Sequence, residues 1–374
     1  MPQILNICPV DDLTIDQLLA IPLNEPELLF QPDAAAIKSR YRALAKKFYP
    51  DKCKDPRAND AFDHAKQLSD AAERKLEEGT WETPGLLQLK QMSGRMSSIR
   101  YLKKHPFELG DMYICDGKLV FVVKEEFEDL FKNAQKNVKA FEFANDKMRN
   151  GISYQLPEYE GSFPTSDGRQ VMVLKRDNDL ILMRDLIDHA GGKIEPVHTA
   201  WILSRLHNLS CYLQSVGIAH NDISPDTVFV RPKDHVNAPE PGSEIAPKDH
   251  TIALLGGWWY AVKEGMGYVG LPERTLNSIP HKDLNSRNPQ ATTRTNQALI
   301  RLVGRELLGD TTGVRLARDS KAPKPLIDWI TLPGCGDAFQ DDKTWREEIL
   351  PQSFGKRRFV AWDVQPNLIY SPHP

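Results

Sequence analysis

The chain has 374 residues, a formal net charge of −3 and 40% apolar residues. This length suits two domains, and the charge provides no global basic field, so we expect no nucleic-acid partner. The five cysteines are scattered, which fits a reducing cytoplasm better than a disulfide-linked secreted protein. The longest nearly apolar run, residues 252–262, is too short to cross a bilayer, so we expect no membrane partner.

Residues 1–78 predict a small all-α domain. Within 33–48, apolar residues recur at helical spacing, Asp33 is placed to cap the helix, and Pro50 follows its end. Residues 59–78 predict a second amphipathic helix. Two long helices joined by a short loop favour a helical hairpin.

A second domain is predicted over residues 109–374, after a linker with some helix at 79–108. Residues 112–124 predict a β-hairpin, because Asp-Gly joins two β-rich runs. A helical pattern follows at 125–148, and helices dominate from about residue 295. Strands first and helices afterwards is an α+β order.

The first informative motif is the stretch 36–62, "AIKSRYRALAKKFYPDKCKDPRANDAF". Residues 37–54 hold seven Lys or Arg against one acid, which favours an acidic protein partner. The register and loop of residues 12–78 resemble the J-domain of chaperone partners, which docks on the seventy-kilodalton heat-shock chaperone. The resemblance implies a chaperone-docking set. It comprises Arg42, Lys46, Tyr49, Pro50 and Asp51. Tyr49 stands where the family has His, which argues against full stimulation of the chaperone.

The second motif is "GIAHNDISPDTVFV", residues 217–230. It resembles the protein-kinase catalytic loop, with His220 and Asp222 at the positions of its His and Asp. The resemblance covers about residues 108–365 and implies a two-lobed α+β fold. It implies nucleotide contact by Lys124, with Glu142 in the following helix as its ion-pair partner, and "GLPERT" as the segment with Pro272 and Glu273.

The departures from the kinase pattern fall on the metal ligands. Thr227 replaces the metal-binding Asn, and Leu255-Gly256-Gly257 replaces Asp-Phe-Gly. Phosphoryl transfer needs cations on the phosphates, and these side chains cannot hold them. We therefore expect a pseudokinase with no metal site, no cofactor, no magnesium and at most weak ATP binding. In that case Asp222 holds the loop, His220 is a core histidine, and Trp258 and Trp259 lie in the core or fill the adenine side of the pocket.

The sequence therefore favours a cytoplasmic, non-catalytic adaptor or scaffold that binds protein partners, including a heat-shock chaperone. Three alternatives stay open. The first is an atypical active kinase that uses Asp222 as its catalytic residue together with Lys124. The second is a true co-chaperone. The third is a structural component of a larger assembly, such as a viral particle.

Overall fold

The computed structural model describes residues 8–78, 81–232, 250–278, 287–319, 321–356, 360 and 362–370. The chain divides into two compact units. The N-terminal unit holds the residues up to 90 together with 94–103, and the C-terminal unit holds 91–93 and 104–370. The boundary at residues 103/104 therefore replaces the predicted linker at 79–108. Each unit is described by itself.

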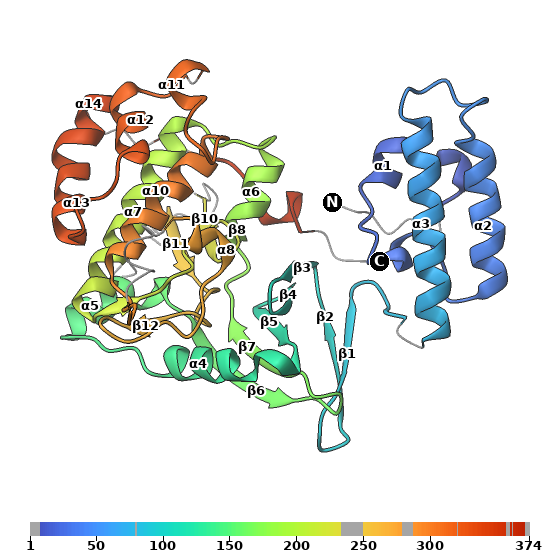
Figure 1. The fold of residues 1–374 in the computed structure, drawn as a ribbon, viewed down its shortest axis with the longest axis horizontal. Coiled ribbons are helices and arrows are strands. Elements are labelled where there is room, and N and C mark those ends of the chain that lie inside the picture. The colour runs from blue at the N-terminus through green and yellow to red at the C-terminus, as the bar shows by residue number, and fades with distance from the viewer. Residues whose placement is uncertain are drawn as a thin grey trace, which may run out of the picture. The chain divides into compact units, whose positions relative to one another are not determined.

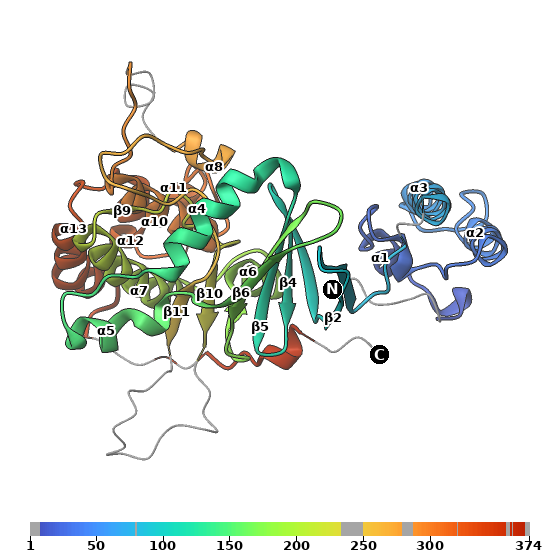
Figure 2. The same cartoon turned by 90° about the horizontal axis from the view of Figure 1, so that it is seen from below.

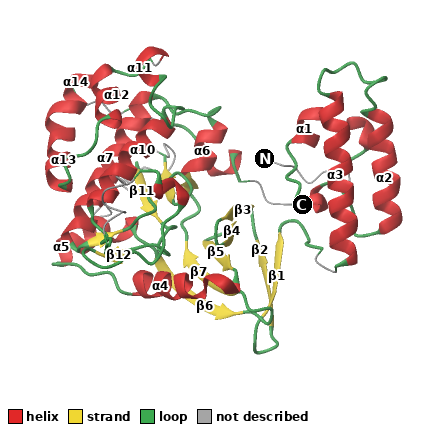
Figure 3. Cartoon of the chain, viewed as in Figure 1, coloured by secondary structure: helices red, strands yellow, loops and turns green. Residues whose placement is uncertain are grey.

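The N-terminal unit contains the helices predicted from the sequence (Figures 1 and 3). Its helices are η1 (Val10–Asp12), α1 (Ile15–Leu19), η2 (Pro26–Leu28), α2 (Ala34–Lys47) and α3 (Ala58–Glu77). The carboxylate of Asp33 accepts the amide N–H of Ala36 and caps α2, as expected. Ile37 and Leu44 of α2 and Leu68 of α3 are fully buried in one apolar core, so the helical hairpin is confirmed.

Residues 79–108 were predicted to be a linker with some helix, and this prediction is wrong. The described part of the segment forms three strands, β1 (Leu86–Lys90), β2 (Met96–Arg100) and β3 (Lys103–Phe107). β1 and β2 pair antiparallel around a turn in which Gly94 has φ +83°. Leu87 and Leu89 are buried while the residues between and after them are exposed, which is a strand alternation.

A five-stranded antiparallel sheet opens the C-terminal unit, with strand order β3-β4-β5-β7-β6. The remaining strands are β4 (Gly110–Cys115), β5 (Lys118–Val123), β6 (Glu158–Pro164) and β7 (Gln170–Lys175). β4 and β5 form the predicted hairpin, and Gly117 takes a φ of +69° in its turn. The helical pattern at 125–148 is interrupted. Its helices are η3 (Glu125–Phe127), α4 (Glu128–Lys139) and α5 (Asp146–Ile152), the last followed by η4 (Ser153–Gln155). α4 packs on β6 and β7 (Figure 2).

The rest of the C-terminal unit is mainly helical. Its first half comprises β8 (Ile181–Leu182), α6 (Met183–His189), α7 (Pro196–Ser215), β9 (Ile218–Ala219), β10 (Val228–Arg231), β11 (Thr251–Leu254), β12 (Val262–Lys263) and α8 (Glu273–Leu276). Its second half comprises α10 (Arg294–Leu307), α11 (Leu316–Asp319), α12 (Lys324–Thr331), α13 (Ala338–Thr344), the π-helical turn η5 (Trp345–Ile349), α14 (Leu350–Phe354) and η6 (Pro366–Leu368). α7 and α10 lie side by side in the buried centre (Figure 1). The antiparallel sheet comes first and helices make up most of the rest, which agrees with the predicted α+β class, although α4 to α7 interrupt the series of strands. None of the described helices combines the length and apolarity needed to cross a membrane.

Candidate functional site

The loop that resembles the kinase catalytic loop connects β9 to β10. His220 is fully buried, its backbone N–H donates to Asn296 Oδ1 at 3.0 Å, and its ring meets Trp258 edge-on at 4.7 Å. Burial lowers the pKa of His220 to about 3. The imidazole is therefore neutral at physiological pH, and the expected core histidine is what the structure contains.

Asp222 is partly exposed as a residue, but its carboxyl group lies deep. Burial raises the pKa of Asp222 to about 8, against an opposing effect of the nearby Arg274. The neutral carboxyl is therefore the major form of Asp222 at neutral pH. The backbone carbonyl of Asp222 accepts the hydroxyl of Thr227 at 2.7 Å, so the contacts around this residue hold the loop together.

The two positions where a kinase holds its metal ions are packed directly against each other. The amide N–H groups of Leu255 and Gly256 both donate to the carbonyl of Thr227, at 3.2 and 3.0 Å. A Cβ on Gly256 would lie 3.1 Å from Thr227 Cα. Across the described part of the chain, no group of three His, Cys, Asp or Glu residues is arranged to hold a metal.

Gly257 brings the same segment against the other side of the loop. Its φ is +79°, and a Cβ there would lie 2.7 Å from the His220 ring and 2.8 Å from the Asp222 carbonyl oxygen. A larger residue would therefore be strained by both its backbone conformation and its contacts. The two glycines allow residues 255–257 to lie flat on the loop.

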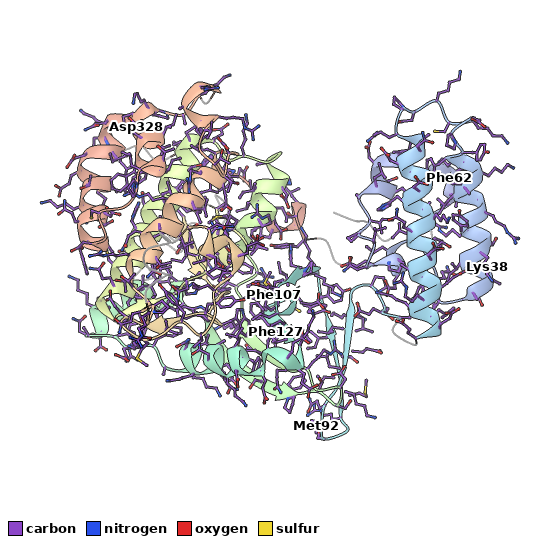
Figure 4. The ribbon with its side chains drawn as sticks, in the orientation of Figure 1. Lys38, Phe62, Met92, Phe107, Phe127 and Asp328 are labelled. Carbon is purple, nitrogen blue, oxygen red and sulfur yellow. The ribbon has the colours of Figure 1, made fainter. Side chains whose placement is uncertain are left out.

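Trp259, which follows these glycines, is 2% exposed and lies among three phenylalanines. Its ring stacks on Phe107 at 5.8 Å and on Phe131 of α4 at 6.3 Å, and it meets Phe121 edge-on at 5.2 Å. Phe107 ends β3 (labelled in Figure 4), and Phe121 lies in β5, the third strand of the sheet. Trp259 therefore fills the space between the first and third strands of the sheet and helix α4.

Two asparagines of α4 fix the backbone of this segment. Asn133 Nδ2 donates to the carbonyls of Trp259 and Ala261, both at 2.9 Å. Asn137, one turn later, donates to the carbonyls of Trp258 at 3.2 Å and Ala261 at 2.8 Å. We call Asn133 and Asn137 the asparagine clamp. It satisfies three carbonyls of an irregular segment and holds it on α4.

The turn between β3 and β4 is tied down as well. The Tyr260 hydroxyl donates to Glu108 Oε2 at 2.9 Å. Gly110, which begins β4, approaches the partner strand so closely that a Cβ would lie 2.1 Å from the carbonyl oxygen of Val122. This glycine therefore has a structural role in strand pairing, in the region where a kinase has its glycine-rich loop.

The structure does not pair Lys124 with Glu142. Lys124 lies one residue beyond β5, its backbone N–H donates to Leu109 O at 2.9 Å, and its side chain is exposed. Glu142 was predicted to lie in the following helix, but α4 ends at Lys139. Its exposed carboxylate forms an ion pair with Lys263 at 3.0 Å, so the predicted partnership is wrong.

The segment "GLPERT" approaches the loop through its arginine. Pro272 precedes α8 and Glu273 begins it. Arg274 Nη1 donates to the carbonyl of Ile223 at 2.8 Å, and its Nη2 pairs with Glu306 at 2.7 Å. The contact with the loop thus comes from Arg274, the residue after the two that the resemblance names.

Four of the five predicted docking residues of the N-terminal unit are exposed. Arg42, Lys46, Tyr49 and Asp51 are exposed and Pro50 is half-buried. The Tyr49 ring meets Phe62 of α3 edge-on at 6.0 Å.

The basic residues of α2 divide into two groups. The Lys47 ammonium donates to the carbonyls of Val10, Asp11 and Leu13 at 2.6–2.8 Å, and Arg40 donates to Cys8 O at 2.9 Å. These two side chains hold the segment before α1. The exposed group consists of Lys38, Arg42 and Lys46, which recur every four residues (Lys38 is labelled in Figure 4). This exposed group is the surface that a partner can reach.

Comparisons with known proteins add little to this geometry. No protein-family model and no curated protein matches the chain. Among solved structures, the chain is similar to one described as "Structure of vaccinia related kinase 3", with 13% identity and a TM-score of 0.44. The match covers 71% of this chain and 92% of the other.

Sequence reasoning missed the asparagine clamp and the tie between Tyr260 and Glu108. The clamp leaves a signal, since Asn133 and Asn137 are polar residues four apart in an amphipathic helix and so share a face. The contact of Tyr260 with Glu108 joins residues 152 positions apart, and no local pattern predicts it.

Proposed function

We propose that this chain is a non-catalytic adaptor, with a degenerate kinase-like unit and a J-like unit that both bind protein partners. The observation that carries the proposal is the position of Trp259. Its ring is packed between strands β3 and β5 of the sheet and helix α4, where it contacts Phe107, Phe121 and Phe131, and the clamp and the glycines hold its segment there.

The protonation of the site supports the same proposal. A kinase needs an ionised aspartate and cations on the phosphates. Here the raised pKa of Asp222 favours the neutral carboxyl, and the two expected metal-ligand positions are Thr227 and Leu255, neither of which has a carboxylate. Lys124 is left without the expected partner Glu142, which instead binds Lys263.

Thermal unfolding with ATP, with and without magnesium, tests the loss of nucleotide function. Ligand binding stabilises by RT ln(1 + [L]/Kd), so ATP at its Kd adds only about 0.4 kcal/mol while ATP at 100 Kd adds about 2.7 kcal/mol. We expect the smaller effect at millimolar ATP and no dependence on magnesium. A large stabilisation that requires magnesium would contradict the proposal and favour the atypical kinase.

A second function, docking on a heat-shock chaperone, is favoured by the exposed row of Lys38, Arg42 and Lys46. A basic face of this kind speeds association with an acidic partner and is weakened by salt. We expect weak, salt-sensitive binding with little ATPase stimulation, because Tyr49 lacks the two ring nitrogens of histidine.

Single-turnover chaperone ATPase measurements on three proteins test the docking function. Tyr49→His should gain stimulation over the parent, and Arg42→Glu with Lys46→Glu should lose association. Strong stimulation by the parent would favour the co-chaperone. No association by any of the three would favour a component of a larger assembly.

A further inference from the structure

The β1–β2 ribbon of the N-terminal unit has one solvent-exposed face. Strand pairing places three cross-strand pairs on this face, namely Leu86 with Arg100, Gln88 with Ser98, and Lys90 with Met96. Of these six residues all but Leu86 are exposed. The opposite face carries Leu87 and Leu89, which are 5% and 1% exposed. We call Gln88, Lys90, Met96, Ser98 and Arg100 the ribbon face.

The ribbon lies in a part of the chain whose charges are all basic. Residues 83–107 hold five Lys or Arg and no Asp or Glu, within a chain of net charge −3. Neither Lys90 nor Arg100 has a carboxylate partner among the described residues. Averaging over the whole chain conceals this segment, which is why the net charge alone predicted no nucleic-acid partner.

We propose that the ribbon face binds the phosphodiester backbone of a double-stranded nucleic acid. Lys, Arg, Ser and Gln are side chains that commonly contact phosphates and sugars. Lys90 and Arg100 are four residues apart along the ribbon, or about 14 Å at about 3.4 Å per residue. Duplex phosphates follow one another by about 3.4 Å of axis per strand, so the two cations contact separate phosphates.

The shape of the ribbon fits the same partner. Paired strands lie about 4.8 Å apart, so a two-stranded ribbon is narrow enough for the B-DNA major groove, which is about 12 Å wide. A protein partner is less suited, because protein interfaces are depleted in Lys and Ser and need apolar anchors, and Met96 is the one large apolar residue of the face. An anionic membrane would gain only about 1 kcal/mol from each basic residue.

Fluorescence anisotropy of the full chain with labelled 20-base-pair DNA and RNA duplexes, between 50 and 200 mM salt, tests the proposal. The variant Lys90→Gln with Arg100→Gln removes two phosphate contacts, so the slope of log K against log salt should fall in magnitude by about 1.8. The affinity of the parent should then drop roughly tenfold more than that of the variant over this range. Ser98→Glu, which places a carboxylate between the two cations, should also weaken binding.

The matched control is Lys66→Gln with Arg74→Gln, which removes the same charge from exposed positions of α3. It should leave the slope unchanged. Binding of either duplex with this pattern supports the proposal, and preference for DNA indicates entry into the major groove. An equal loss from the α3 variant, or no anisotropy change at 50 mM salt, overturns it. More effective competition by poly-glutamate or by phosphatidylserine vesicles than by unlabelled duplex also overturns it, in favour of an acidic protein or a membrane.

Discussion

Replacing Trp259 by Ala tests whether the indole fills the site or merely lies near it. The change removes a side chain that is 2% exposed and touches Phe107, Phe121 and Phe131. A buried Trp→Ala substitution costs about 3–5 kcal/mol in total, with the lost contacts of the ring included. We expect a loss of about 4 kcal/mol in the free energy of unfolding of the C-terminal unit.

Urea denaturation followed by circular dichroism measures this loss. For a unit of this size, about 4 kcal/mol corresponds to a fall in Tm of roughly 8–16 °C. Trp259→Phe is the control, since it keeps a ring and should lose less than half as much. Because the cavity lies among aromatic rings, indole should partly restore the Tm of Trp259→Ala but leave the parent unchanged. A loss below 1 kcal/mol, or an equal response of both proteins to indole, would refute the packing argument.

Three further predictions concern the loop, the clamp and the N-terminal unit. Asp222 has a raised pKa when folded, so the folded state holds the extra proton and stability falls as pH rises from about 4 to about 8. Asp222→Asn removes this dependence. Between pH 5 and pH 8 its free energy of unfolding should rise by about 1–3 kcal/mol relative to that of the parent, a range reduced because the residue is partly accessible to water. A difference in urea midpoints that stays constant across this range would contradict the raised pKa. Asn133→Ala with Asn137→Ala leaves three carbonyls without these donors. Amide hydrogen exchange of residues 255–261 should therefore accelerate at least tenfold, while that of α10 stays constant. The same exchange rates in the variant and the parent would show that the clamp does not hold the segment. Lys47→Met should destabilise the N-terminal unit by about 2–3 kcal/mol, because its ammonium holds three carbonyls, whereas exposed Lys46→Met should change its urea midpoint little; equal effects would contradict the distinction between buried and exposed lysines.

The sequence predicted the elements whose local signals agree with their packing. α2 combines a capping Asp33 with an apolar stripe, and the β4–β5 hairpin combines β-rich runs with Asp-Gly. The strand at 86–90 was missed because Leu, Gln and Lys favour helix as readily as strand, and only burial of alternate leucines distinguishes the two.

The sequence placed Glu142 in a helix because it does not show the tertiary contacts that end this helix. The helical pattern of the sequence continues past Lys139, but the two phenylalanines that follow pack against different parts of the unit. Phe141 meets Trp258 edge-on at 5.0 Å, and Phe143 stacks on Tyr212 at 5.8 Å. These contacts join residues far apart in the sequence and require a non-helical backbone at this point. A local sequence pattern therefore does not predict where the helix ends. Asn145, whose side chain accepts the Met148 N–H, is the local sign that a new helix begins.

The residues that depart from the kinase pattern contact one another, so the position of each depends on the others. Two glycines at 256 and 257 let the segment lie within contact distance of Thr227 and His220; a Cβ at 257 would collide with His220, and one at 256 would lie tightly against Thr227. That close approach in turn sets Trp258 against His220 and directs Trp259 under the sheet, where α4 secures the backbone with two amides. An Asp restored at 255 would still lack a second metal ligand at Thr227, and Trp259 would remain packed among the three phenylalanines. Under the proposed function, phosphoryl transfer would therefore require changes at 227, 255 and 259 together. The mutual packing of these residues is what makes the loop and residues 255–261 one tightly held unit.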